Sequence, residues 1–140
     1  MQPLEPEVFN ILKINKISFR WYPPNSREEN IIMGKVNTIF PSKWNRIQPE
    51  KAALKYQRIK CSSDNELIKV FVGFLNSFPP STASYIMWSD GAKGTTRIAT
   101  GDILRYSEDV YYEDSDMWVF GKGFSWCIEL YHDLEVTIFT

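Results

Sequence analysis

The chain has 140 residues, of which 44% are hydrophobic and 15% aromatic. This length and apolar content suffice for one hydrophobic core, so we predict a single domain over residues 1–140 and exclude disorder of the whole chain. The formal net charge of −1 is unevenly spread, with 11 Lys/Arg and 5 Asp/Glu in residues 1–60 but 5 and 12 in residues 61–140. Two interpretations stay open: two oppositely charged faces, or two halves that complement each other within one fold.

Cysteine usage and the N-terminal sequence predict a cytosolic protein. Cys61 and Cys127 lie far apart and form no CxxC motif, so we expect free thiols, with one disulfide between them as the alternative. The first residues lack the charged and apolar regions of a signal peptide. No apolar run approaches the roughly 20 residues that span a bilayer, so we expect no membrane partner.

The first half of the chain predicts mainly helices. A helical pattern covers residues 8–14, and residues 18–22 look extended. Ser26 and Glu29 form a capping box that opens a second helix, which ends before Pro41. Pro49 could open a short helix that reaches Tyr56, or the whole stretch of residues 41–60 could be irregular.

The next segment contains the strongest helical pattern. Ser63 and Glu66 form a second capping box, and a broad apolar stripe follows as far as Phe78. Residues 83–88 and 95–98 predict a hairpin around a Ser-Asp-Gly turn. Thr100 is then expected to cap a short helix that ends near Tyr106.

The C-terminal segment predicts a three-stranded antiparallel meander over residues 117–120, 124–131 and 135–139. In the middle strand the apolar face, which should receive the helices, consists of Phe124, Trp126, Ile128 and Leu130. The other face consists of Ser125, Cys127, Glu129 and Tyr131, and we expect it to be partly wet. The predicted fold class is therefore α+β, with helices packed on one face of an antiparallel sheet and a C-terminal β-meander.

The residues that catalysis usually needs are scarce. His132 is the only histidine, it falls in a predicted turn, and no G-x-S-x-G elbow accompanies it. One histidine and two separated cysteines do not make a usual zinc site, and the acidic run lacks the glycine and closing glutamate of an EF-hand. No glycine-rich phosphate loop is present. We therefore predict no enzymatic activity, no metal and no cofactor.

One acidic and aromatic run stands out, at residues 108–118. Its acids are Glu108, Asp109, Glu113, Asp114 and Asp116, and its aromatic residues are Tyr111, Tyr112 and Trp118. One interpretation is a solvated charged loop between a helix and a strand. The other is a partner-binding surface, because aromatic side chains anchor interfaces and acids steer a cationic partner. On that hypothesis, neutralising all five acids weakens binding without unfolding the protein.

The C-terminal segment resembles a known group of proteins, and this resemblance indicates which kind of partner the surface would bind. The segment from Trp118 to Asp133, with Phe-Ser-Trp-Cys followed by two turns and Glu-Val, resembles the ending of small bacterial domains that include immunity proteins of contact-dependent inhibition and other polymorphic toxin systems. It covers about the last third of the chain. It implies an intracellular, non-enzymatic protein that binds and neutralises a cognate toxin domain, often a nuclease. The choice of binding residues rests on the electrostatic argument and not on the resemblance.

A second functional hypothesis is a single-stranded nucleic-acid-binding module. Basic and aromatic residues alternate in the N-terminal half, namely Arg20, Trp21, Tyr22, Lys43, Trp44 and Arg46. Such residues stack bases and neutralise phosphates. Against this hypothesis, the pI is about 5.9 and no RNP, helix-turn-helix or zinc motif is present.

Overall fold

The computed structural model describes residues 2–43 and 45–140. Its main feature is an antiparallel seven-stranded sheet with the order β1-β6-β5-β7-β8-β9-β4, and β2 and β3 form a separate hairpin. The strands are β1 (Phe19–Tyr22), β2 (Ser42–Lys43), β3 (Arg46–Ile47), β4 (Tyr56–Lys60), β5 (Ala83–Trp88), β6 (Thr95–Ala99), β7 (Met117–Phe120), β8 (Cys127–Tyr131) and β9 (Glu135–Phe139). The helices are α1 (Val8–Ile14), α2 (Arg27–Ile39), α3 (Asp64–Leu75), α4 (Thr100–Arg105) and α5 (Ser107–Tyr111), with 3₁₀ turns η1 (Pro49–Lys51), η2 (Gly91–Lys93) and η3 (Lys122–Phe124).

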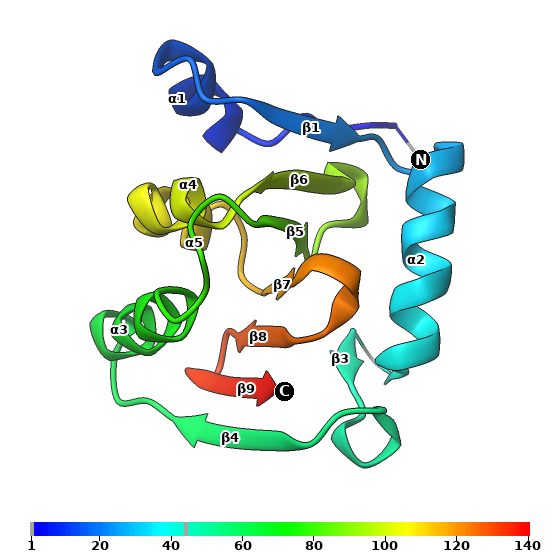
Figure 1. The fold of residues 1–140 in the computed structure, drawn as a ribbon, viewed down its shortest axis with the longest axis vertical. Coiled ribbons are helices and arrows are strands. Elements are labelled where there is room, and N and C mark those ends of the chain that lie inside the picture. Colours follow the sequence, from blue (N-terminus) through cyan, green and yellow to red (C-terminus); the bar gives the residue numbers. More distant parts are fainter. Residues whose placement is uncertain (1, 44) are drawn as a thin grey trace.

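Helices lie on both sides of the sheet (Figure 1). The side chains of β5 alternate between two hydrophobic cores. Ile86 and Trp88 pack in the core under α1, α3, α4 and α5, whereas Met87 packs in the core under α2. The predicted α+β class, with its antiparallel sheet and C-terminal meander, is confirmed. Four helices share one face as expected, and α2 adds a layer on the other face.

Both predicted capping boxes begin helices. The backbone N–H of Glu29 donates to Ser26 Oγ at 3.3 Å, and that of Glu66 donates to Ser63 Oγ at 3.2 Å. A hydroxyl oxygen at this position satisfies one of the free N–H groups of the first turn. Neither glutamate carboxylate returns to the capping serine, since Glu66 accepts from Ser62 and Glu29 accepts from Thr95. The Glu29 carboxylate therefore takes no part in capping the helix and contacts β6 through Thr95.

Helix α3 anchors the larger core. Leu67, Phe71 and Leu75 of this helix are fully buried against the sheet. Burying one such side chain contributes about 1.5 to 3 kcal/mol. Farther along, Phe78 stacks on Trp126, with ring centroids 4.4 Å apart. Trp126 also lies against Gly121, where an added Cβ would be 2.1 Å from the indole Nε1, so this position requires glycine.

Three local predictions differ from the structure, the first of them because of pairing with a distant strand. The stretch after Pro49 forms only the single turn η1, and Tyr56 begins an edge strand, β4, that pairs with β9. The start of the acidic run is not a loop, because residues 107–111 form α5. The middle strand of the meander begins at Cys127, because residues 122–124 form η3 around Gly123, whose φ of 67° is left-handed.

The expectation of a partly wet face on β8 is wrong for two of its residues, although Tyr131 of that face is half-buried. Cys127 and Glu129 are both fully buried, because α2 and the β2–β3 hairpin cover that face of the sheet. Cys61 and Cys127 are free thiols, as expected, and both are buried. None of the helices in the described ranges combines the length and apolar character that crossing a bilayer requires.

Candidate partner-binding site

Three of the five acids in the predicted surface make internal contacts. Glu113 accepts the backbone N–H of Val8 at 2.7 Å and pairs with Lys93 Nζ at 3.0 Å, and its side chain is only 4% exposed. Asp114 accepts the backbone N–H of Asp90 at 2.9 Å. Asp116 is buried and accepts from the backbone N–H and ring Nδ1 of His132. These carboxylates connect the segment after α5 to α1, η2 and the β8–β9 turn.

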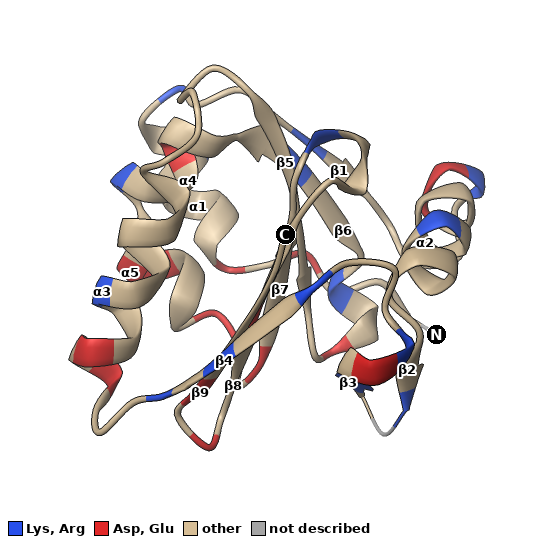
Figure 2. Ribbon diagram, turned by 60° about the horizontal axis from the view of Figure 1, so that its bottom comes forward, with Lys and Arg blue, Asp and Glu red and all other residues tan. Residues whose placement is uncertain are grey.

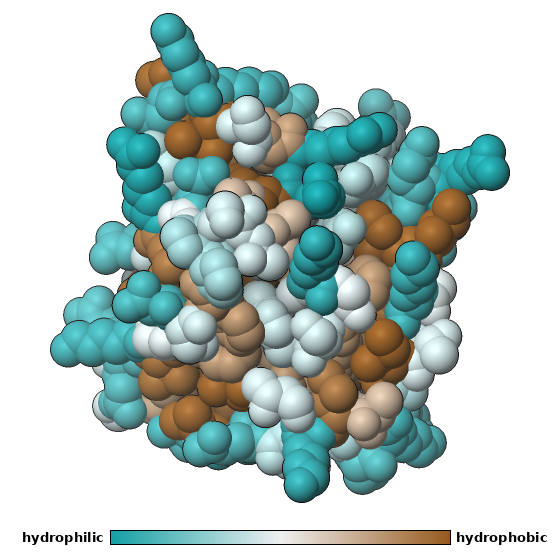
Figure 3. All heavy atoms as spheres, viewed as in Figure 1, coloured by the Kyte–Doolittle hydropathy of each residue, from teal (hydrophilic) through white to brown (hydrophobic). Residues whose placement is uncertain are grey.

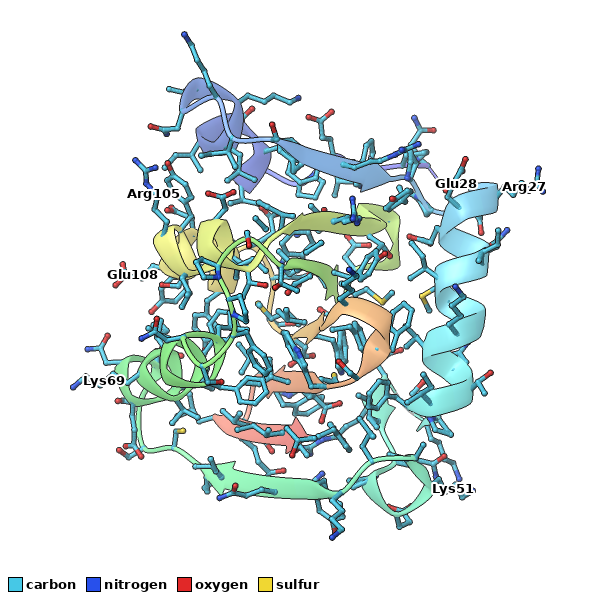
Figure 4. The ribbon with its side chains drawn as sticks, in the orientation of Figure 1. Arg27, Glu28, Lys51, Lys69, Arg105 and Glu108 are labelled. Atoms are coloured by element: carbon cyan, nitrogen blue, oxygen red, sulfur yellow. The ribbon has the colours of Figure 1, made fainter. Side chains whose placement is uncertain are left out.

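The remaining members of the predicted surface lie on two faces of the molecule. Glu108 and Asp109 are exposed on α5 and Tyr112 is exposed directly after it, and Glu108 points into solvent on the same side as Arg105 and Lys69 (Figure 4). Tyr111 is buried, and its hydroxyl donates to Asp64 Oδ1 at 2.7 Å. Trp118 faces the α2 core, on the opposite side of the sheet.

This placement divides the predicted surface into parts with different roles. Acidic residues gather around α5 and the start of α3 (Figure 2), so an acidic exterior exists there. The expectation that neutralising all five acids leaves the fold intact needs revision, because three of them hold buried or half-buried donors. Glu108, Asp109 and Tyr112 remain predicted partner-binding residues.

The residues of the nucleic-acid hypothesis are also dispersed. Trp21 is partly buried, with its indole N–H donating to the Lys93 carbonyl at 2.7 Å and its ring 6.0 Å from that of Phe9. Arg46 forms ion pairs with Glu129 and Glu135. Arg20 and Lys43 are exposed, with the Arg20 guanidinium 5.4 Å from the Tyr22 ring centroid. Trp44 lies outside the described residues.

A cleft of about 220 Å³ opens between α2, the β2–β3 hairpin and strands β5, β6 and β7. Its apolar wall is formed by Met33, Val36, Phe40, Met87, Trp118 and Phe120. Polar groups that line it come from Glu29, Asn37, Asn45, Ser89 and Thr95. We call this the α2 cleft. A mostly apolar hollow with a few convergent polar groups is the usual form of a binding site.

Glu29 supplies the charge of the α2 cleft. Its carboxylate accepts a hydrogen bond from Thr95 Oγ1 at 3.1 Å. Burial raises the pKa of Glu29, although the hydrogen bonds from Thr95 and from the Asn25 backbone act in the opposite direction. No lysine or arginine among the described residues forms an ion pair with it. A partly buried carboxylate without a cation favours a positively charged ligand.

Trp118 is held in place by a buried carboxylate. Its indole Nε1 donates to Glu129 Oε2 at 2.8 Å, and the same oxygen accepts the backbone N–H of Ile47 at 2.9 Å. Arg46 Nε donates to Glu129 Oε1 at 3.2 Å and the guanidinium also pairs with Glu135. The Arg46 guanidinium lies 4.2 Å from the Tyr131 ring centroid. Burial alone would lower the pKa of Arg46, but Glu129 and Glu135 raise it.

The Arg46–Glu129 network therefore fixes two walls of the cleft at once. Glu129 of β8 connects the β2–β3 hairpin, through Arg46 and Ile47, to Trp118 on the neighbouring strand β7. Side chains locked by such contacts present a pre-formed site.

Sequence signals for these residues were incomplete. Glu29, Met33, Val36 and Phe40 follow an i, i+4, i+7, i+11 pattern, which places an acid within the apolar stripe of α2. That pattern could have identified Glu29, which was interpreted as a capping residue only. Glu129 gave no comparable signal, since its partners Arg46 and Ile47 are more than 80 residues away in the chain.

Chemically, the α2 cleft can hold a cation. A carboxylate accepts hydrogen bonds from ammonium or guanidinium groups, and tryptophan is the aromatic residue that attracts cations best. His132 lies elsewhere, in the β8–β9 turn, with Nδ1 2.9 Å from Asp116 Oδ1. Within residues 2–43 and 45–140, no group of three or more His, Cys, Asp or Glu side chains is placed to hold a metal ion. Comparison of the chain with known protein families and with curated proteins gave no match.

Proposed function

We propose that this chain is a non-enzymatic protein-binding module, an immunity protein that neutralises a basic toxin domain by holding one of its cationic side chains in the α2 cleft. The observation that supports this most is the Glu29 carboxylate, which is partly buried, lines the same cleft as Trp118 and has no cationic partner among the described residues. As in the sequence hypothesis, the proposed binding surface is acidic and aromatic. Trp118 belongs both to the acidic run of residues 108–118 and to the α2 cleft.

The energetics favour a lysine or arginine side chain as the occupant. A charge-assisted hydrogen bond to the Glu29 carboxylate contributes about 1.5 to 3 kcal/mol. A cation near Trp118 adds about 0.5 to 2 kcal/mol, more as water is excluded. The aliphatic stem of such a side chain also suits the apolar wall formed by Met33 and Phe40. One anchored side chain of this kind is a typical interface hot spot.

The exposed acids on α5 have a separate role in this proposal. Glu108 and Asp109 lie on the four-helix side, whereas Trp118 packs on the α2 side of the sheet. A compact partner cannot contact both groups at once. Glu108, Asp109 and Tyr112 would therefore lie outside the contact at the α2 cleft, and the two acids would only attract a basic partner from a distance at low salt.

Affinity capture from the protein's own cell lysate tests the proposal. At about 200 mM salt, which screens long-range attraction by the exposed acids, tagged wild type is compared with Glu29→Gln, which keeps the size of the side chain, and with the double variant Glu108→Gln/Asp109→Asn as the matched control. A basic protein retained by wild type and the control but lost with Glu29→Gln supports the proposal. Loss with the double variant alone would move the interface to α5. Capture of nucleic acid in place of protein would contradict the proposed function.

A further inference from the structure

Two arginines face each other across β1 and β6. Arg20 is the register partner of Arg97, and both side chains are exposed on the α2 side of the sheet, because the neighbouring Phe19, Trp21 and Ile98 face the four-helix core. Like charges directly opposite on adjacent strands destabilise a sheet. Neither guanidinium forms an ion pair with a carboxylate of the described residues. An unfavourable pair that nothing in the fold neutralises points to a ligand.

An apolar groove lies on the same side of the sheet as this pair, between α2 and η3. Its walls are formed by Ile31, Ile39 and Phe124, with Lys35 at its side, and the hollow measures about 600 Å³. Ile31 is 52% exposed, and an added Cβ at Gly34 or Gly123 would have no neighbour within 4 Å. In Figure 3 hydrophobic surface appears along the side of the molecule where Figure 1 places α2. We call this the α2–η3 groove.

Stacked aromatic rings connect the groove to the arginine pair. Phe124 of the groove stacks on Tyr85 at a centroid distance of 5.4 Å, and Tyr85 is the register partner of Arg97. The groove lies on the other flank of α2 from the α2 cleft, since Ile31, Lys35 and Thr38 line the groove while Glu29, Met33 and Asn37 line the cleft. The two sites have opposite charge and share no lining residue.

The charge of this surface identifies the chemistry of its occupant. Arg20, Lys35, Arg97 and Lys122 are exposed, and none of them forms an ion pair within residues 2–43 and 45–140. In a two-fold dimer that pairs this surface with itself, the same cations would face each other. Single-stranded nucleic acid needs free aromatic faces, but Phe124 is only 7% exposed and stacks on Tyr85. Acidic and aliphatic groups complement the surface best.

We propose that the α2–η3 groove and the Arg20–Arg97 pair together bind an acidic, aliphatic segment of a partner protein. Carboxylates of the segment pair with the two guanidiniums, whose fork geometry suits bidentate contacts. An aliphatic side chain of the segment occupies the groove beside Ile31 and Phe124. The inference is independent of the α2 cleft.

The probe is a fluorescein-labelled hexapeptide, Glu-Leu-Asp-Glu-Leu-Asp, and its neutral counterpart is Gln-Leu-Asn-Gln-Leu-Asn. Fluorescence anisotropy is measured at about 20 mM and about 200 mM salt, because screening weakens exposed charge pairs between these limits. The variants are Arg20→Thr, Arg97→Thr and Ile31→Ser, and Arg105→Gln on the four-helix side is the control. A single-stranded oligo(dT) of about twelve nucleotides is the competing probe.

We expect wild type to bind the acidic peptide at low salt and not the neutral peptide. Arg20→Thr, Arg97→Thr and Ile31→Ser should each weaken binding about tenfold or more, with Arg105→Gln unchanged. Arg97→Thr should also raise the melting temperature, more so at low salt, because it removes the repulsion from Arg20. The inference is overturned if wild type binds no acidic peptide, if Arg97→Thr binds it equally well, if oligo(dT) binds in its place, or if Arg97→Thr lowers the melting temperature.

Discussion

Trp118 and Glu129 are joined across β7 and β8 by a hydrogen bond of 2.8 Å from the indole N–H to a carboxylate that no solvent reaches. The same carboxylate accepts from Arg46 and from the Ile47 backbone, so one side chain satisfies three donors from two segments, β3 and β7. This arrangement sets the position of the β2–β3 hairpin over the sheet, and with it the shape of the α2 cleft.

Removal of the Glu129 carboxylate should strongly destabilise the fold. Glu129→Ala leaves Arg46 Nε, the Ile47 N–H and the Trp118 N–H without their acceptor, which we expect to lower the free energy of unfolding by about 3 to 5 kcal/mol. Glu129→Gln keeps an acceptor oxygen and should cost less. Urea denaturation of both variants measures the difference. Equal stability of Glu129→Ala and wild type would show that the network does not support the fold.

Substitution of Glu29 should raise the free energy of unfolding, whereas substitution of Glu129 should lower it. Its pKa is raised in the fold, mainly by burial, so the folded state disfavours the ionised carboxylate and loses stability as pH rises through the folded pKa. Glu29→Gln removes this penalty and keeps an acceptor for Thr95. We expect the variant to be more stable than wild type at pH 7, by less than about 1 kcal/mol, and equally stable below about pH 4. Lower stability at pH 7 would show that Glu29 is a structural residue.

The acids of residues 108–116 should fall into two groups that differ in how much they contribute to the free energy of unfolding. Glu108→Gln/Asp109→Asn alters exposed side chains and should change the free energy of unfolding by no more than about 0.5 kcal/mol. Glu113→Gln/Asp114→Asn/Asp116→Asn removes the charges that hold Lys93, Val8 and His132, and we expect a loss of about 3 kcal/mol or more. Thermal and urea unfolding compare the two variants. Similar effects from both would contradict the internal roles assigned here.

Asp114 should contribute to stability only above acidic pH. Burial acts to raise its pKa, but hydrogen bonds from the Asp90 and Ser115 backbones and the charge of Lys93 lower it overall. The folded state therefore favours the ionised form, and that stability is present at neutral pH and is lost as pH falls through the folded pKa. Asp114→Asn should be less stable than wild type at pH 7, and the gap should narrow below about pH 4. Urea denaturation between pH 7 and pH 3 checks this, with Asp109→Asn as the exposed control. A gap that stays constant with pH would contradict it.

Local signals in the sequence predicted the elements well where they act within a few residues. Ser26 and Ser63 each cap a helix as their spacing indicated, and the turns of the C-terminal meander fall where glycine and aspartate were interpreted as turns. Strand β4 was missed because its residues acquire their structure by pairing with β9, about 80 residues later. Propensity over a short window carries no information on such a pairing.

The candidate site depended more heavily on distant contacts. The amino-acid composition of residues 108–118 was enough to identify the acidic run. The ion pairs of Glu113 and Asp114 with Lys93 form only because η2 packs against the segment after α5. The burial of Glu129 follows from the hairpin that brings Arg46 over β8. Only Glu29, placed on the apolar stripe of its own helix, could have been recognised from periodicity.

The most direct test of the α2 cleft is a titration of ¹⁵N-labelled protein with acetyl-Gly-Arg-Gly-amide, observed at the indole N–H of Trp118, with acetyl-Gly-Gln-Gly-amide as the neutral control. We predict that the Trp118 signal shifts and saturates with the arginine peptide at a Kd of about 1 mM, or −4 kcal/mol. The glutamine peptide should leave it unchanged, and Glu29→Gln should abolish the shift. An arginine peptide that leaves Trp118 unmoved, or that moves it equally in Glu29→Gln, would contradict the account.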